Sequence, residues 1–166
     1  QGPPLLLWSR AVTSVGGGVE VVHELEAVAG RELVFLAVPS AHVPTVLAQL
    51  GGYLDGRHQL VHVSRGLIGR GLRPISAAIR EHTPCRRIGA LAGPLSAGAL
   101  SSGKAAGAVI GSDFPEVIAA ARAALSAPSL FVEASDDLVG VELASALTGL
   151  LLVCVVGMSL GSGLTA

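Results

Sequence analysis

Short apolar runs alternate with amphipathic stretches along most of this chain. The clearest run is ELVFLAVPS (32–40), which is apolar almost throughout and stops at a proline, as a buried strand does. Similar runs predict strands at 5–8, 19–22, 59–64, 86–94, 105–112 and 129–135. Between them, apolar residues at helical spacing predict helices over 23–30, 42–52, 72–84 and 114–127.

Strands that alternate with helices are typical of an α/β fold with a largely parallel sheet. In such sheets, ligands bind in the loops at the carboxyl ends of the strands. The loops to inspect are therefore 9–10, 39–40, 64–66 and 93–97.

The segment from Leu143 to Ala166 contains no charged residue, and it is long enough to cross a membrane. Ser and Thr residues and several glycines interrupt it, and no aromatic or basic residues flank it. A helix buried between protein layers is also hydrophobic on all sides. We therefore prefer a buried helix, with a membrane span as the alternative.

Composition and charge reduce the range of binding partners that we expect. The net charge of −1 gives no reason to expect nucleic acid or an anionic membrane. The two cysteines and five histidines show no metal-binding spacing, so we predict no metal site. With only two thiols, a reducing cytoplasm is the simpler location. We interpret the histidines as structural or surface residues, with His62 inside a strand as a core histidine.

Several short motifs occur in one order: LLLWSR, LVFLAVPS, SRGL, AGPLSAGA, FVEASDDLVGVELASAL and GMSLGSG. In this order they resemble the bacterial type of NAD(P)-dependent glycerol-3-phosphate dehydrogenase. The specific part is the string from Asp137 to Leu143, followed by Gly157, Gly161 and Gly163. Each of the other motifs is weak by itself.

The resemblance implies a Rossmann-like, doubly wound, mostly parallel sheet that lacks the first βα unit. The first long helix of an α-helical domain would follow it. Residues 1–136 would form a partial NAD(P)-binding domain, and residues 137–166 would begin the helical substrate domain. The implied reaction interconverts dihydroxyacetone phosphate and sn-glycerol 3-phosphate, with NAD or NADP as cofactor.

The resemblance also assigns the N-terminal part of the site. Ser9 and Arg10 would lie near the adenosine ribose, and Arg suits bidentate contact with a 2′-phosphate. A solvated loop arginine is an equal alternative. Pro39 and Ser40 would lie along the cofactor cleft, although Pro39 is also explained as a strand terminator.

Arg65 matches the position of a family lysine that contacts cofactor and substrate, and it keeps the charge in a planar fork. Gly93 matches a glycine whose backbone approaches substrate, and Ala97 matches an alanine near the cofactor. The family's catalytic lysine position is occupied by Thr148. A threonine hydroxyl does not act as an acid or base near neutral pH without an activating partner. We therefore expect weak or absent catalysis, and a non-catalytic nucleotide-binding or interaction module is the alternative function.

The triglycine at 16–18 does not directly follow a predicted strand, so we do not assign it to the cofactor's pyrophosphate. Without a first strand, the 5–8 strand must pair directly with the 32–40 strand or leave that strand's edge open. An open apolar edge pairs readily with another chain. We therefore expect a homo-oligomer, or a chain that is a fragment of a longer protein.

Overall fold

The computed structural model describes residues 5–95 and 97–161. Its strands are β1 Leu6–Trp8, β2 Glu20–Val22, β3 Leu33–Leu36, β4 Gln59–His62, β5 Arg87–Ala92, β6 Ala106–Gly111 and β7 Leu130–Ser135. Its helices are α1 Leu25–Val28, η1 Ser40–His42 (a 3-10 turn), α2 Val43–Leu50, α3 Ile75–His82, α4 Ala97–Ser101, α5 Pro115–Ala124 and α6 Leu138–Gly161. Each predicted strand and helix is present with shorter bounds, whereas η1 and α4 were not predicted.

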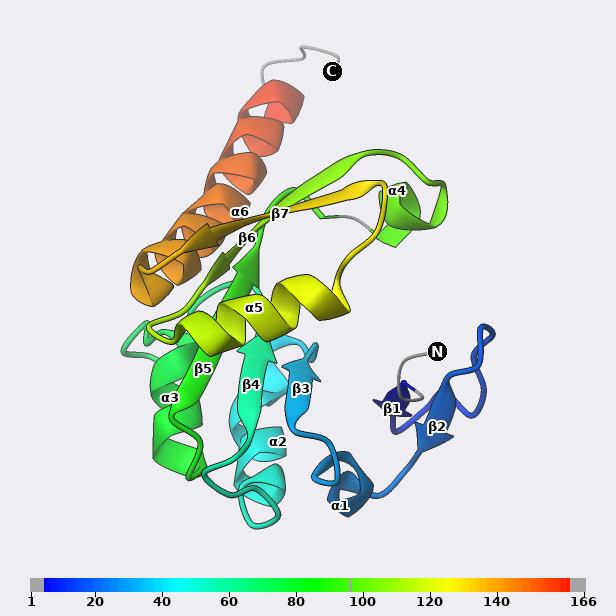
Figure 1. Ribbon diagram of the computed structural model, residues 1–166. Coiled ribbons are helices and arrows are strands. Elements are labelled where there is room, and N and C mark those ends of the chain that lie inside the picture. Colours follow the sequence, from blue (N-terminus) through cyan, green and yellow to red (C-terminus); the bar gives the residue numbers. More distant parts are fainter. Residues whose placement is uncertain (1–4, 96, 162–166) are drawn as a thin grey trace.

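The main sheet has five strands in the order β3-β4-β5-β6-β7 (Figure 1). All neighbours are parallel except β5 and β6, which run antiparallel with Ala90 opposite Gly111. A parallel connection needs a long crossover, usually a helix. The segment between β5 and β6 holds only the five-residue α4, so the chain returns in the opposite direction. The expected mostly parallel α/β sheet is confirmed, with this one reversal.

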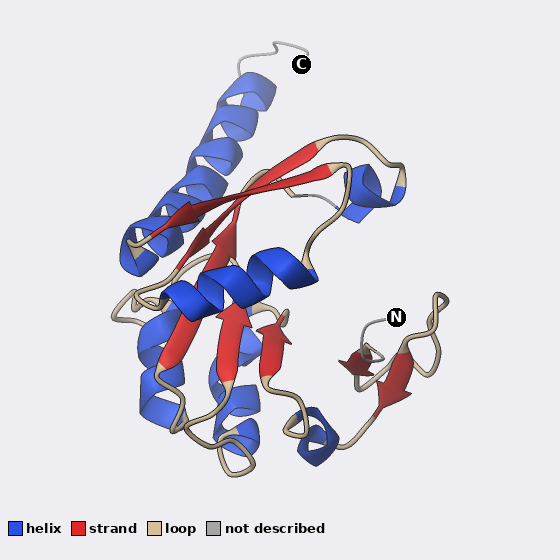
Figure 2. Ribbon diagram, viewed as in Figure 1, coloured by secondary structure: helices blue, strands red, loops and turns tan. Residues whose placement is uncertain are grey.

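Helices cover both faces of the sheet (Figure 2). On one face, Leu60 and Ile88 pack with α2, α3 and the start of α6. On the other face, Val61 and Ile110 pack with α5. The helices lie there because their apolar residues form one stripe, as in α2, whose buried positions are Val43, Val46, Leu47 and Leu50. This two-sided covering is the doubly wound arrangement that the resemblance implies.

The N-terminal strands form a separate sheet. β1 pairs with β2 in parallel, with Leu7 opposite Val21, and neither strand pairs with β3. Figure 1 shows this pair beside β3, at the side opposite α6. Among the described residues, β3 therefore has one strand neighbour and an open edge. Of the two expected arrangements, direct pairing of the first strand with β3 is wrong and the open edge is confirmed.

The long helix α6 is attached to the sheet by its first turns only. The Asp137 carboxylate accepts a hydrogen bond from the Gly140 amide at 2.7 Å and caps the helix. Leu138 and Val141 are buried beside it. Beyond them the helix extends past the sheet (Figure 1). The segment Leu138–Ser159 is long and apolar enough to cross a membrane, with a mean hydropathy of 2.2. Only its first turns belong to the core of this domain, and its later turns are exposed. The expectation that this helix is buried between protein layers is therefore wrong for its later turns.

Candidate functional site

The parallel strands β3, β4 and β5 bring three predicted loops to one edge of the sheet. Ser40 follows β3, Arg65 follows β4 and Gly93 follows β5. The Ser64 hydroxyl donates a hydrogen bond to the Val38 carbonyl, which joins the first two loops. A side chain added at Gly66 would meet the Ser40 hydroxyl at 3.9 Å, so these residues are close.

The guanidinium group of Arg65 is held against the loop that follows β5. Its Nη2 donates to the carbonyl oxygens of Gly93 and Leu95, each at 3.0 Å. Guanidinium has five N–H donors, so three are left for another acceptor. No carboxylate pairs with Arg65 among the described residues, and its side chain is exposed. The group is thus oriented and has free capacity for an anion.

Backbone geometry requires glycine at two of these turns. Gly66 has φ +93 and Gly93 has φ +147, a region that favours glycine. A Cβ at Gly93 would also lie 2.5 Å from the carbonyl oxygen of Gly107 on β6. Glycine therefore permits β6 to approach this loop and leaves its carbonyl available to Arg65.

A hollow of about 430 Å³ opens beside the Arg65 guanidinium. Most of its walls are apolar, and its lining includes Val63, Arg65, Leu91, Gly93, Leu100 and Leu130. Binding sites for small molecules typically combine such apolar walls with a few polar groups. A guanidinium group can form paired hydrogen bonds with the oxygens of an anion.

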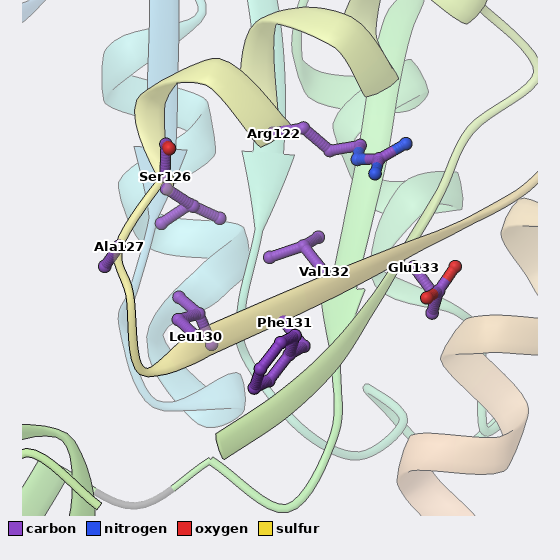
Figure 3. Close-up of a pocket in the computed structure, with 8 residues that line it drawn as sticks. Arg122, Ser126, Ala127, Leu130, Phe131, Val132 and Glu133 are labelled. Atoms are coloured by element: carbon purple, nitrogen blue, oxygen red, sulfur yellow. The ribbon is translucent and has the colours of Figure 1, made fainter. Parts of the chain in front are cut away.

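A second hollow of about 250 Å³ lies between the end of α5 and β7 (Figure 3). Leu125 and Leu130 line both hollows. The polar part of its lining comes from Arg122, Ser126 and Glu133. None of the residues predicted from the sequence lines this second hollow, so the first one is the candidate functional site.

Ser9 and Arg10 lie at the end of β1, in the smaller sheet. The Ser9 hydroxyl accepts hydrogen bonds from the amides of Ala11 and Val12, and it thereby shapes the turn. The Arg10 guanidinium lies 5.6 Å from the centre of the Trp8 ring. The structure does not join these residues to Arg65 by any contact within the described chain. The triglycine at 16–18 lies in the connection between β1 and β2, and β2 follows it directly.

Thr148 stands on the exposed part of α6, and its hydroxyl donates to the Ala144 carbonyl at 2.7 Å. Within the described residues, no contact links it to Arg65 or Gly93. Ala97 begins α4, which follows the Gly93 loop, but its side chain lies outside the described part. Gly163 also lies outside the described residues.

Sequence reasoning missed one buried polar cluster, which joins β4, α3 and α6. The Glu142 carboxylate accepts hydrogen bonds from the Ser76 amide at 2.8 Å and from the Ser76 hydroxyl. Its Oε1 lies 3.0 Å from His62 Nε2. The expected burial of His62 is confirmed, but its acidic partner is far away in the sequence and no local signal could have revealed it.

These contacts decide the charge state of Glu142. Burial by itself raises the pKa of this carboxyl group, but the hydrogen bonds from His62 and Ser76 outweigh burial and hold the pKa below its ordinary value. Glu142 is therefore a carboxylate at neutral pH. One donor on β4 and two on α3 hold the Glu142 carboxylate in place. Because Glu142 belongs to α6, these contacts also hold the start of that helix.

Comparison with known proteins shows which family this chain belongs to. The family model for the N-terminus of NAD-dependent glycerol-3-phosphate dehydrogenase matches residues 16–118. The chain belongs to this family. The resemblance predicted from the motifs is thus confirmed. The glycerol-3-phosphate dehydrogenase (NAD(P)+) of Azotobacter vinelandii is 35% identical over 149 residues, which are 88% of this chain and 43% of that protein.

Solved dehydrogenases share the fold. The chain superposes on glycerol-3-phosphate dehydrogenase from Coxiella burnetii with a TM-score of 0.72 and 18% identity, covering 78% of this chain and 40% of the other. DsGPDH of Dunaliella salina gives a TM-score of 0.82 and 20% identity, covering 90% of this chain and 29% of the other. The chain therefore has the Rossmann-type fold of these dehydrogenases, and it spans less than half of their length.

Proposed function

We propose that this chain supplies the cofactor-binding and phosphate-binding part of an NAD(P)-dependent glycerol-3-phosphate dehydrogenase. The observation that carries the proposal is the Arg65 guanidinium: two carbonyl oxygens hold it, it has further donors, and Arg65 lines a mostly apolar hollow. Residues 1–136 would hold the cofactor, and residues 137–166 would begin the substrate domain. The location would be the cytoplasm.

Each residue predicted to bind cofactor or substrate has a task in this proposal. Pro39, Ser40 and Ala97 would border the cofactor, and Ser9 and Arg10 would meet its adenosine end. Arg65 would bind the substrate phosphate and the cofactor, and the Gly93 loop would let substrate approach the backbone. When bound, the nicotinamide supplies or accepts the hydride. The chain's own contribution is to orient the phosphate and to exclude water with apolar walls.

The test of this proposal is the binding of sn-glycerol 3-phosphate and NADH, measured by isothermal titration calorimetry. A charge-assisted hydrogen bond contributes about 1.5–3 kcal/mol, so Arg65→Met should weaken binding of the phosphate ester about tenfold or more. Arg70→Met is the matched control, because Arg70 is an exposed arginine in the same connection between β4 and α3. Equal affinity in the wild type and Arg65→Met would contradict the proposal.

One observation favours a second candidate, a non-catalytic nucleotide-binding module. The Thr148 hydroxyl is hydrogen-bonded back to its own helix, and no described acid or base activates it. Proton transfer to the substrate oxygen would then lack its donor. Oxidation of NADH in the presence of dihydroxyacetone phosphate separates the candidates. The second predicts cofactor binding without turnover, and turnover that Thr148→Ala abolishes would exclude it.

We also propose that the chain self-associates. The open edge of β3 and the exposed leucines of α6 support this proposal, because both are surfaces that favour a protein partner. Sedimentation velocity should give a species larger than the 16.6 kDa chain. A single monomeric species at all concentrations would contradict the proposal.

A further inference from the structure

The Glu142 carboxylate contacts both ends of the connection between β4 and α3. His62, whose Nε2 lies 3.0 Å from Glu142 Oε1, is the last residue of β4. Ser76, which donates from its amide at 2.8 Å and also from its hydroxyl, lies in the first turn of α3. One carboxylate on a third element, α6, therefore holds together the two points at which the connection 63–75 begins and ends.

These contacts are shielded from water. Ser76 is 1% exposed, His62 is 3% exposed and Glu142 is 4% exposed. Hydrogen bonds to a charged group are stronger than those between neutral groups, and in a buried site the donors have no other acceptor. The two ends of the connection are therefore held firmly to Glu142.

Glu142 also supplies a side-chain cap that α3 does not have in its own sequence. The residue before α3 is Pro74, which makes no side-chain capping bond, so the first amides of the helix need another acceptor. The Glu142 carboxylate accepts from the Ser76 amide, and its negative charge suits the positive end of the helix dipole. The position of α3, and with it the far end of the connection, thus depends on a residue of α6.

Arg65 lies in the connection that these contacts close, three residues after His62. The middle of the connection is folded on itself, because the amides of Ile68 and Arg73 each donate to the carbonyl of the other, at 2.9 and 3.0 Å. A shift of α3 would therefore pass through this hairpin to the backbone of Arg65. The guanidinium would then lose the alignment with the two carbonyl oxygens that orient it.

We propose that Glu142 is a positioning residue for the phosphate site: by holding His62 and Ser76 together, it keeps Arg65 oriented for the substrate phosphate. This inference rests on the proposed function of Arg65. Glu142 would touch no ligand and would act only through the connection that carries Arg65. Because Glu142 belongs to α6, the helix that would begin the substrate domain is bonded directly to this connection.

The test is a double-mutant cycle on the affinity of the full chain for sn-glycerol 3-phosphate, measured by isothermal titration calorimetry. Glu142→Leu removes the acceptor and keeps a side chain of similar size, so the guanidinium must be ordered when the ligand binds. Ordering one long side chain should weaken binding about threefold to tenfold. In Arg65→Met, which already lacks the guanidinium, adding Glu142→Leu should change the affinity by less than about twofold. A residue that only stabilises the fold would show the same loss in both backgrounds.

Three further variants separate positioning from stability. Glu142→Gln keeps an oxygen that accepts from the Ser76 amide and from His62, so it should bind the phosphate ester within about twofold of the wild type. Leu138→Ala is the matched control, because it destabilises the start of the same helix and takes part in none of these hydrogen bonds; its affinity should be unchanged. Ser76→Ala keeps the amide bond and loses the hydroxyl bond, so it should weaken binding about twofold to threefold. Ser76→Ala takes the place of Glu142→Leu in the cycle if circular dichroism shows that the latter is unfolded.

The outcomes distinguish this inference from the proposed function. Unchanged affinity in the position variant, an equal loss with and without Arg65, or a loss in Leu138→Ala as large as that in Glu142→Leu overturns the inference and leaves the proposed function intact. If the wild type does not bind the phosphate ester, or binds it no better than Arg65→Met, both are wrong.

Discussion

In α6, the end that contains a charged residue is buried, and the end that contains none is exposed. The first turns contain a glutamate and are buried: Leu138 is 1% exposed and Glu142 is 4% exposed. The later turns contain no charge and are exposed, with Leu151 at 63% and Val153 at 71%. An uncharged run therefore indicates a helix without indicating burial. The anchor of this helix is found through a buried carboxylate that has partners on other elements.

Among substitutions that test this contrast, Glu142→Ala should cause the largest loss in the free energy of unfolding. The substitution leaves the Ser76 amide, the Ser76 hydroxyl and His62 Nε2 without their acceptor in the core. Each buried donor left without its acceptor costs about 1–3 kcal/mol. Urea unfolding should show that loss in the free energy of unfolding. A loss below about 1 kcal/mol would mean that the cluster does not hold the helix.

A matched pair of leucines on the same helix gives the next largest effect. Leu138→Ala should lower the free energy of unfolding by about 3 kcal/mol, because Leu138 is almost fully buried. Leu151→Ala should change it by less than about 0.5 kcal/mol, because Leu151 is exposed. Both values come from urea unfolding of the two variants. Similar losses for both would show that a partner buries the later turns.

Acid should reduce the stability that the Glu142 carboxylate gives to the fold. The pKa of Glu142 is lower in the folded chain than its ordinary value of 4.5, because the hydrogen bonds of His62 and Ser76 outweigh the opposing effect of burial. The carboxylate therefore stabilises the fold fully above about pH 4.5. That contribution is lost as the pH falls through the lower, folded pKa. Unfolding midpoints measured between about pH 7 and pH 3 should fall more steeply for the wild type than for Glu142→Gln. Parallel curves would contradict this assignment.

The smallest effect is expected at the exposed end. Thr148→Val removes only a hydroxyl that is bonded to the Ala144 carbonyl on the same helix. The free energy of unfolding should change by less than about 0.5 kcal/mol. Thermal unfolding monitored by circular dichroism measures it. A much larger change would reveal a partner for Thr148 in the assembled protein.

The local pattern of apolar residues predicted most of the strands and helices. It did not predict strand direction or the contacts between distant elements. Apolar runs located the strands because burial on both faces leaves a run of uninterrupted apolar residues. The short α4 and the antiparallel β6 were missed, since no local pattern records which direction a strand takes. The partnership of His62 with Glu142 depends on packing between distant elements, which the sequence alone does not display.

The candidate site shows the same division. Ser40, Arg65 and Gly93 come together because each follows a parallel strand, and this convergence was predictable. The hydrogen bonds from Arg65 to the loop after β5 could not be predicted, because they depend on the conformation of that loop. Sheet pairing does not bring Arg10 to these residues, because β1 pairs with β2 in a separate sheet and not with β3.

Hydrogen–deuterium exchange with and without NADPH tests the central claim most directly. If the carboxyl ends of β3, β4 and β5 form the cofactor and phosphate site, NADPH should slow exchange in segments 38–42, 64–68 and 91–95. The later turns of α6 should be unaffected, as should the residues that line only the hollow between α5 and β7, such as Arg122 and Glu133. Protection confined to that second hollow, or no protection in any segment, would contradict the account.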